Sequence, residues 1–252
     1  MEAQHRKPVI VLVHGAWQTA ATWDLVVPRL RASGCDVHTA RLTGMEGEPS
    51  EMTGGVTLDT HIADVVRHLE AADLRDVILV GHSYAGMIIT GVAERVRQRL
   101  MRLVYADAFV PEDGQSAMQL LPAPIQKTFR DQAKAEPDGF RLRPNESILD
   151  VWGLKPGPVR DFVRARMSDF SVRCFEQPIA LPLRAAATID RTYIACVADG
   201  YPAKAAFAPF AQRARAESWQ YHELPTGHDC HAEMPDAFAA LLTSEVRVSS
   251  NH

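Results

Sequence analysis

A tight turn between a predicted strand and a predicted helix constrains the fold of this 252-residue chain more than any other segment. The apolar run Val77–Val80 ends at Gly81-His-Ser-Tyr-Ala-Gly86, and an amphipathic helical stretch begins at Met87. The pattern Gly-x-Ser-x-Gly in this context is typical of a turn that exposes its serine, because a side chain at either glycine would collide with the neighbouring strand or helix. Ser83 is therefore the candidate nucleophile. The amide of Tyr84, at the helix N-terminus, is a candidate donor to a developing negative charge.

The chain also supplies a candidate acid and a candidate general base, in the order serine, acid, histidine. His228 lies in a loop directly after a short predicted strand, 219–224, and is favoured over His231, which falls where the chain turns into the final helix. Asp199 and Asp107 both end predicted strands, so both could supply the acid at the same edge of a parallel sheet. The sequence favours Asp199, because its strand immediately precedes the His228 loop.

A second amide donor is predicted after the first strand. The continuous apolar run Val9–Val13 indicates a strand covered on both faces, and it ends at His14-Gly15-Ala16-Trp17. The small residue after this turn allows the N–H of Ala16 to point into the space above Ser83. The amides of Ala16 and Tyr84 are therefore predicted to form an oxyanion hole.

Predicted strands and helices alternate along most of the chain, which indicates an α/β fold with a mostly parallel sheet and helices on both faces. The pattern changes after residue 110, where nine of the sixteen prolines fall between residues 111 and 182 and the helical patterns become short. The predicted organisation is a core formed by residues 1–110 and 185–252, with a cap inserted at 111–184.

The predicted cap carries large apolar side chains that a solvated loop would not need, so they are interpreted as pocket walls. Together with Trp17 beside the oxyanion turn, the predicted substrate-binding residues are Trp152, Phe162, Met167 and Phe170.

Several segments together resemble the α/β-hydrolases, in particular the group of plant methyl-ester esterases, plant hydroxynitrile lyases and bacterial small-molecule esterases. The matching segments span nearly the whole chain in the family order: residues 11–17, 81–87, 193–199, and 227–228 with 233–235. The resemblance implies the α/β-hydrolase fold, and relatives that include homodimers suggest a homodimer here. Lyases of this group have a threonine after the first-strand histidine and a lysine after the catalytic histidine. This chain has Gly15 and Asp229 at those positions, so the resemblance favours an esterase.

The predicted function is a serine hydrolase that cleaves a small, largely apolar carboxylic ester through an acyl-enzyme. In this prediction His228 takes the proton of Ser83, and Asp199 holds the imidazole. Two alternatives stay open. One is a lyase, or a C–C or lactone hydrolase, using the same triad; the other is a binding protein or receptor on the same fold, which would not need all three side chains.

The net charge, the cysteines and the lengths of the apolar runs limit the classes of partner, cofactor and location that the sequence allows. The net charge of −4, with interspersed signs, argues against nucleic-acid binding. The four cysteines are scattered without a C-x-x-C pattern, and the segment from His228 to His231 is too short to supply four metal ligands, so no cofactor or metal is predicted. The apolar stretch after Lys7 is only a strand long, and no apolar run approaches the roughly 20 residues that cross a bilayer. A cytoplasmic protein without signal peptide or membrane contact is expected.

Overall fold

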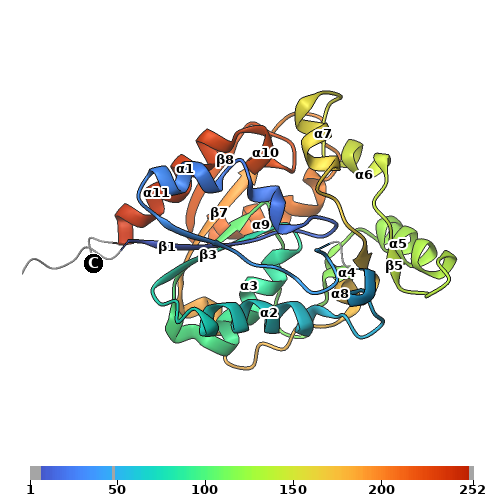
Figure 1. Cartoon of the computed structure of the whole chain (residues 1–252), viewed down its shortest axis with the longest axis horizontal. Helices are drawn as coiled ribbons and strands as arrows, with labels where there is room; N and C mark the ends of the chain where they lie inside the picture. Colours follow the sequence, from blue (N-terminus) through green and yellow to red (C-terminus); the bar gives the residue numbers. More distant parts are fainter. Residues whose placement is uncertain (1–6, 47–48, 250–252) are drawn as a thin grey trace, which may run out of the picture.

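Six parallel strands form the central sheet of the computed structural model, which describes residues 7–46 and 49–249 (Figure 1). From one edge to the other they are β2 (Asp36–Thr39), β1 (Val9–Val13), β3 (Val77–His82), β4 (Leu100–Ala106), β7 (Asp190–Cys196) and β8 (Gln220–Leu224). Because all neighbours are parallel, the carboxyl ends of the six strands meet at one edge of the sheet. This is the edge where open α/β sheets gather their ligand-binding groups.

Helices cover both faces of the sheet, as the alternation of patterns predicted. Their bounds are α1 (Val27–Ala32), α2 (Leu58–Ala71), α3 (Ala85–Val96), α9 (Lys204–Ala216), α10 (Cys230–Glu233) and α11 (Pro235–Ser249), with single 3₁₀ turns η1 (Ala20–Trp23), η2 (Pro49–Glu51) and η3 (Arg97–Arg99). Successive strand residues point to opposite faces. Leu12 belongs to the buried cluster that contains Leu30 of α1 and Phe238 of α11, whereas Val11 belongs to the cluster on the other face, which contains residues of α2, α3 and α9. Figure 1 shows α1 and α11 on one side of the sheet and α2 and α3 on the other.

The connection from β4 to β7 contains one helix of 13 residues, α5, together with helices of 4 to 7 residues and a small antiparallel sheet. It comprises α4 (Ala117–Leu120), α5 (Ala123–Ala135), β5 (Arg141–Leu142), α6 (Glu146–Val151), α7 (Pro158–Arg164), β6 (Phe170–Ser171), α8 (Val172–Glu176) and η4 (Ala185–Thr188). Residues 111–184 contribute no strand to the six-stranded sheet. We refer to residues 111–184 as the insertion; in Figure 1 its helices lie to the right of the sheet.

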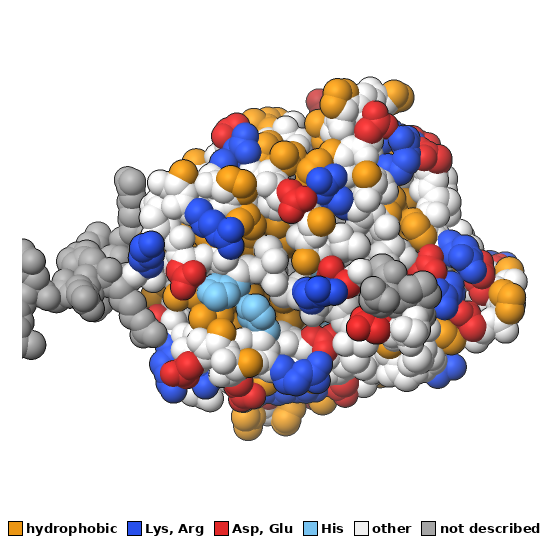
Figure 2. All heavy atoms as spheres, in the orientation of Figure 1, with side chains coloured by type: hydrophobic (Ala, Val, Ile, Leu, Met, Phe, Trp, Pro, Cys, Tyr) orange, Lys and Arg blue, Asp and Glu red, His pale blue; other side chains and the backbone are white. Residues whose placement is uncertain are grey.

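The surface shows no field of one charge on the face drawn in Figure 2, where basic and acidic side chains are interspersed. Among the described residues, no helix is both long enough and apolar enough to cross a membrane.

Candidate active site

The turn after β3 holds Ser83 in a strained conformation. Its φ is +58°, in the left-handed region that non-glycine residues rarely adopt and that is often found at functional sites. The two glycines of the motif allow this turn, as predicted: a Cβ atom on Gly81 would lie 2.7 Å from the carbonyl oxygen of Ala85, and one on Gly86 would lie 2.0 Å from that of Phe109. The hydroxyl is thereby presented at the carboxyl edge of the sheet, and Ser83 is half-buried.

His228 is within hydrogen-bond distance of the serine, with its Nε2 2.8 Å from Ser83 Oγ. Its backbone is held on both sides: the N–H donates to the carbonyl of Trp152 at 2.8 Å, and the carbonyl accepts from His82 Nε2 at 2.9 Å. The imidazole stacks on the ring of Phe207, with ring centroids 4.6 Å apart. His231, the competing histidine, is instead buried beside Thr22, 2.8 Å from its hydroxyl.

The acid that meets His228 is Asp107, so the prediction of Asp199 is wrong. His228 Nδ1 lies 2.7 Å from Asp107 Oδ2, and both side chains are buried. Asp107 follows β4 directly and has a φ of +42°, a turn that directs its carboxylate toward His228. Asp199 lies three residues beyond the end of β7 and is exposed to solvent. The two strand ends are neighbours in the sheet, so strand order alone could not separate them.

Tyr201 is a further site residue that the sequence analysis missed. Its hydroxyl donates to Asp107 Oδ2 at 2.5 Å, while the N–H of Cys196 donates to Oδ1 at 3.4 Å. Burial raises the pKa of the Tyr201 phenol, and the neighbouring Asp107 raises it further, so the phenol stays protonated and can donate. The sequence feature that could have indicated Tyr201 is its position in the turn after β7, two residues after Asp199.

The two predicted oxyanion donors are free of other partners. Within residues 7–46 and 49–249, the amides of Ala16 and Tyr84 donate to no acceptor. The turn before Ala16 is pressed against the nucleophile, since a Cβ on Gly15 would lie 2.9 Å from Ser83 Cβ. Unpaired N–H groups beside the serine are what an oxyanion hole requires.

Aromatic side chains of the insertion surround Trp17, which is itself strained, with a φ of +60°. The ring of Trp17 lies 5.5 Å from that of Phe170 and 6.3 Å from that of Trp152, measured between centroids. Two further rings complete this aromatic cluster, Phe129 at 5.3 Å and Phe175 at 5.7 Å from Trp17. Phe175 is one of the apolar side chains that the sequence indicated as walls of the cap, whereas Phe129 was not among them.

The other two predicted pocket residues are placed differently. Phe162 makes no ring contact with the cluster within the described part of the chain, and the guanidinium of Arg166 covers its ring at 3.7 Å. The prediction that Phe162 lines the pocket is therefore not supported by its position. Met167 is half-buried and pairs with Gln18, next to Trp17, through an isolated backbone bridge.

Asp229, the residue after His228, lies in a buried polar cluster. Its Oδ1 accepts a hydrogen bond from Gln18 Nε2 at 2.5 Å. A carboxylate oxygen of Asp229 and a ring nitrogen from each of His82 and His231 lie within 4.8 Å of one another. Burial raises the pKa of Asp229 to about 6 and lowers that of His231 to about 3. The side chain that stands where lyases carry a lysine thus accepts a hydrogen bond from the loop after β1.

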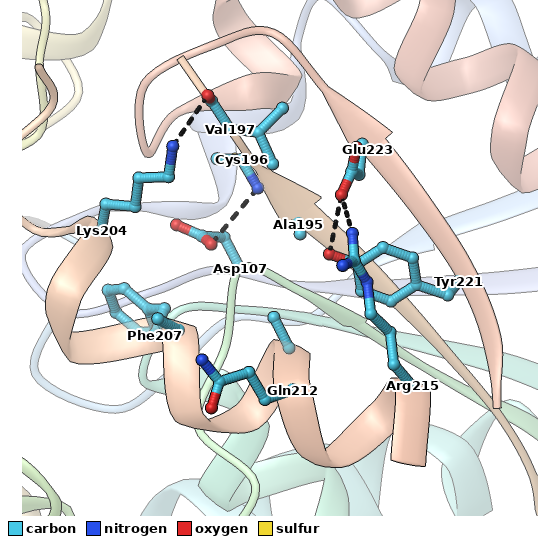
Figure 3. A pocket seen from close by; sticks show the side chains of 12 residues that line it. Asp107, Ala195, Cys196, Val197, Lys204, Phe207, Gln212, Arg215, Tyr221 and Glu223 are labelled. Carbon is cyan, nitrogen blue, oxygen red and sulfur yellow. Dashed lines mark hydrogen bonds and ion pairs between the residues drawn. The ribbon is translucent and has the colours of Figure 1, made fainter. Parts of the chain in front are cut away.

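A cavity of about 340 Å³ lies behind the acid, between α9 and β8 (Figure 3). Asp107, Phe207 and Tyr221 are among its lining residues, whereas Ser83 is not. Figure 3 shows the Asp107 carboxylate turned toward the N–H of Cys196 at one end of the cavity. The cavity therefore borders the triad on the side away from the nucleophile.

Comparison with known proteins identifies the family. The model of the alpha/beta hydrolase family matches residues 10–241. A carbendazim hydrolyzing esterase from Nocardioides sp. (strain SG-4G) is 37% identical over 243 residues, covering 93% of this chain and 98% of that protein. An alpha-hydroxynitrile lyase of Arabidopsis thaliana is 30% identical over 108 residues, 42% of each chain. Among solved structures, an extracellular alpha/beta-hydrolase from a Paenibacillus species superposes with a TM-score of 0.80 at 24% identity, covering 94% of this chain and 98% of that one. The chain therefore belongs to the alpha/beta hydrolase family.

Proposed function

We propose that this protein hydrolyses a compact, largely apolar carboxylic ester, with Ser83, His228 and Asp107 as its catalytic triad. Family membership and the full-length esterase relative already make the chain an ester-cleaving hydrolase. The observation that carries the residue roles is the continuous hydrogen-bonded chain from Asp107 Oδ2 through the imidazole to Ser83 Oγ, with distances of 2.7 and 2.8 Å.

In the first half of the reaction, Ser83 Oγ attacks the ester carbonyl carbon while its proton passes to His228 Nε2. Asp107, bonded to Nδ1–H, holds the imidazole in the tautomer whose Nε2 can accept that proton, and stabilises the imidazolium that forms. The tetrahedral intermediate then collapses, the bond to the alcohol oxygen breaks, and that oxygen takes the proton from His228. The acyl group remains on Ser83.

In the second half, water gives a proton to His228 Nε2 and attacks the acyl carbon. The second tetrahedral intermediate releases the carboxylic acid, and Ser83 Oγ regains its proton. The amides of Ala16 and Tyr84 bind the oxyanion in both halves. One such donor typically contributes about 10²–10³ in rate.

We propose that the insertion is a cap and that the aromatic cluster around Trp17 forms the acyl or alcohol pocket. Trp17, at the centre of the cluster, directly follows Ala16, and the ring of Trp152 lies 5.9 Å from that of His228. A substrate in contact with these rings would therefore be close to the reacting atoms. Rigid aromatic walls favour a flat or compact apolar group. The esterase relative is named for carbendazim, which makes that aromatic carbamate a suitable test substrate beside simple esters.

The experiment that tests the function is labelling with a fluorophosphonate probe followed by peptide mapping. Labelling is expected at Ser83, and Ser83→Ala should lose both labelling and turnover of p-nitrophenyl acetate. The exposed Ser147→Ala variant is the matched control and should keep both. Labelling at a different serine, or full turnover by Ser83→Ala, would refute the proposal.

Cyanohydrin cleavage is the alternative activity to exclude, because one relative is a hydroxynitrile lyase. A lyase needs a cation to hold the leaving cyanide, and the residue after His228 is Asp229, buried against Gln18. Mandelonitrile should therefore release cyanide at a rate far below that of ester hydrolysis. Comparable rates would favour the lyase.

We further propose a cytoplasmic location. The support is that all four cysteines are free and buried, with no disulfide between them, as is usual for proteins of a reducing compartment. Cell fractionation with an antibody against the protein would test it.

A further inference from the structure

The carboxylate of Asp107 is held by two strong donors on one oxygen. Oδ2 accepts from His228 Nδ1 at 2.7 Å and from the hydroxyl of Tyr201 at 2.5 Å, whereas Oδ1 has only the longer contact of 3.4 Å from the N–H of Cys196. Within the described part of the chain, Tyr201 is the only side chain besides His228 that hydrogen-bonds to this carboxylate. Hydrogen bonds to a charged acceptor are short and directional, so the phenol sets where Oδ2 faces the imidazole.

Tyr201 is in turn held by the insertion. Gly153, with a φ of +84°, packs so closely that a Cβ there would lie 2.7 Å from Tyr201 Cβ. Two residues after Tyr201, the N–H of Ala203 donates to the carbonyl of Val151 at 3.0 Å. The next carbonyl of the insertion, that of Trp152, accepts from the N–H of His228 at 2.8 Å. Residues 151–153 therefore contact both Tyr201 and the catalytic histidine.

We propose that Tyr201 is a positioning residue for the catalytic acid. It orients Asp107 toward His228 and is kept in place by the turn at residues 151–153. This inference rests on the proposed triad. The sequence indicated that the loop after β7 supplies the acid. The loop supplies Tyr201, whose hydroxyl bonds to the acid at the end of the neighbouring strand β4.

Loss of the phenol hydroxyl has two expected consequences. Asp107 Oδ2 keeps a single strong donor and is free to rotate away from the imidazole, which slows the steps that form imidazolium. The carboxylate also retains more negative charge, which favours the protonated imidazole. The first effect lowers kcat, and the second moves the acidic limb of the pH–rate profile toward higher pH.

The test compares Tyr201→Phe with Tyr221→Phe and Asp107→Asn in the full-length protein. Tyr201→Phe keeps the ring that packs against Gly153 and should lower kcat about 10- to 100-fold, the range expected for a hydrogen bond to a charged group. KM should stay within about twofold of wild type, and the midpoint of the acidic limb of kcat/KM should rise. Tyr221→Phe, which removes a hydroxyl bonded to Glu223, should behave as wild type.

The outcomes separate this inference from the proposed function. If Asp107→Asn is inactive but Tyr201→Phe keeps the wild-type kcat and pH midpoint, the positioning role is refuted and the triad stands. Asp107→Asn fully active would refute the triad itself. A Tyr201→Phe protein with a lower melting temperature, but with wild-type kcat and pH midpoint, would show a purely structural tyrosine and also overturn the inference.

Discussion

At the scale of single residues, the two candidate acids differ in the backbone that carries them. Asp107 follows β4 without a spacer, and its φ of +42° turns the carboxylate into the site. Asp199 follows β7 at a distance of three residues, in an exposed turn with Gly200, whose φ is +73°. A carboxylate in water cannot hold a buried imidazole.

Exchange of the two acids for amides should therefore have unequal effects. Asp107→Asn is expected to lower kcat by on the order of 10⁴, the loss seen when the acid of a serine protease triad becomes an amide that stabilises the wrong imidazole tautomer. Asp199→Asn should stay within about twofold of wild type. Steady-state kinetics on p-nitrophenyl acetate decides between them, and a severe loss in Asp199→Asn alone would restore the acid that the sequence favoured.

The buried Asp229 should make stability depend on pH. Burial raises its folded-state pKa to about 6, above the ordinary value of 3.8, so the folded protein favours the protonated carboxyl group. The stability that this group contributes is thus fully present below about pH 4 and is lost as the pH rises through about 6. His61 and His231 act in the opposite direction. Burial lowers their pKa values to about 4 and about 3, so the stability that they contribute to the folded protein is lost as the pH falls below about 6.5.

The variant Asp229→Asn separates the contribution of the aspartate to the pH dependence of stability from that of the two histidines. The amide oxygen can still accept from Gln18, and no ionisation cost remains. The variant should gain stability over wild type by up to about 3 kcal/mol at pH 8 and by only about 1 kcal/mol at pH 4.5. Urea unfolding of both proteins at the two pH values measures the difference. A gap that is the same at both values would mean that Asp229 does not change its charge between them.

At the scale of elements, the turn between β3 and α3 depends on glycine at one crowded position. A Cβ on Gly86 would lie 2.0 Å from the carbonyl oxygen of Phe109, which is backbone and cannot move aside. Gly86→Ala should therefore cost about 3 kcal/mol or more of stability and abolish labelling of Ser83. Gly55 is exposed, and a Cβ there meets only the Thr53 hydroxyl at 3.6 Å, so Gly55→Ala should change stability by about 0.5 kcal/mol at most. Equal melting temperatures for the two variants would contradict this account of the turn.

At the scale of the whole molecule, the insertion packs aromatic side chains around Trp17, which lies in the loop after β1. Two backbone hydrogen bonds join this loop to the insertion. The N–H of Ser168 donates to the carbonyl of Trp17 at 2.8 Å, and the N–H of Thr19 donates to the carbonyl of Arg166 at 3.0 Å. The pocket that we propose among these rings should therefore accept acyl chains only up to a definite length.

The acyl-chain preference should reflect that closed pocket. Each buried methylene contributes about 0.8 kcal/mol, so kcat/KM is expected to rise from acetyl esters and then fall once the chain exceeds the pocket. Trp152→Ala should shift the maximum to longer chains with little change on acetyl esters, and Trp152→Leu is a milder variant if the first is unstable. Phe162→Ala, outside the aromatic cluster, is the control and should keep the wild-type profile. A wild-type profile that climbs to dodecanoyl would indicate an open groove, and an unchanged maximum in Trp152→Ala would remove that residue from the pocket.

The sequence by itself determined the parts of this protein that depend on local pattern. The glycines around Ser83, the apolar run of β1 and the alternation of strands and helices require only short-range sterics and burial, and each was confirmed by the structure. The position of His228 after the last strand belongs with them, because a loop that follows a parallel strand must emerge at the carboxyl edge.

Only the tertiary structure decided between Asp107 and Asp199 and brought Tyr201 to the acid. Both aspartates end strands at the same edge, and a strand pattern does not encode which way the next residue turns. The direction of Asp107 goes with a single left-handed φ, and the position of Tyr201 depends on contacts with residues 151–153, about 50 positions away along the chain. The aromatic cluster was half predicted for the same reason: composition indicated apolar walls, but only packing could show that Phe129 and Phe175 face Trp17 and that Phe162 lies under Arg166.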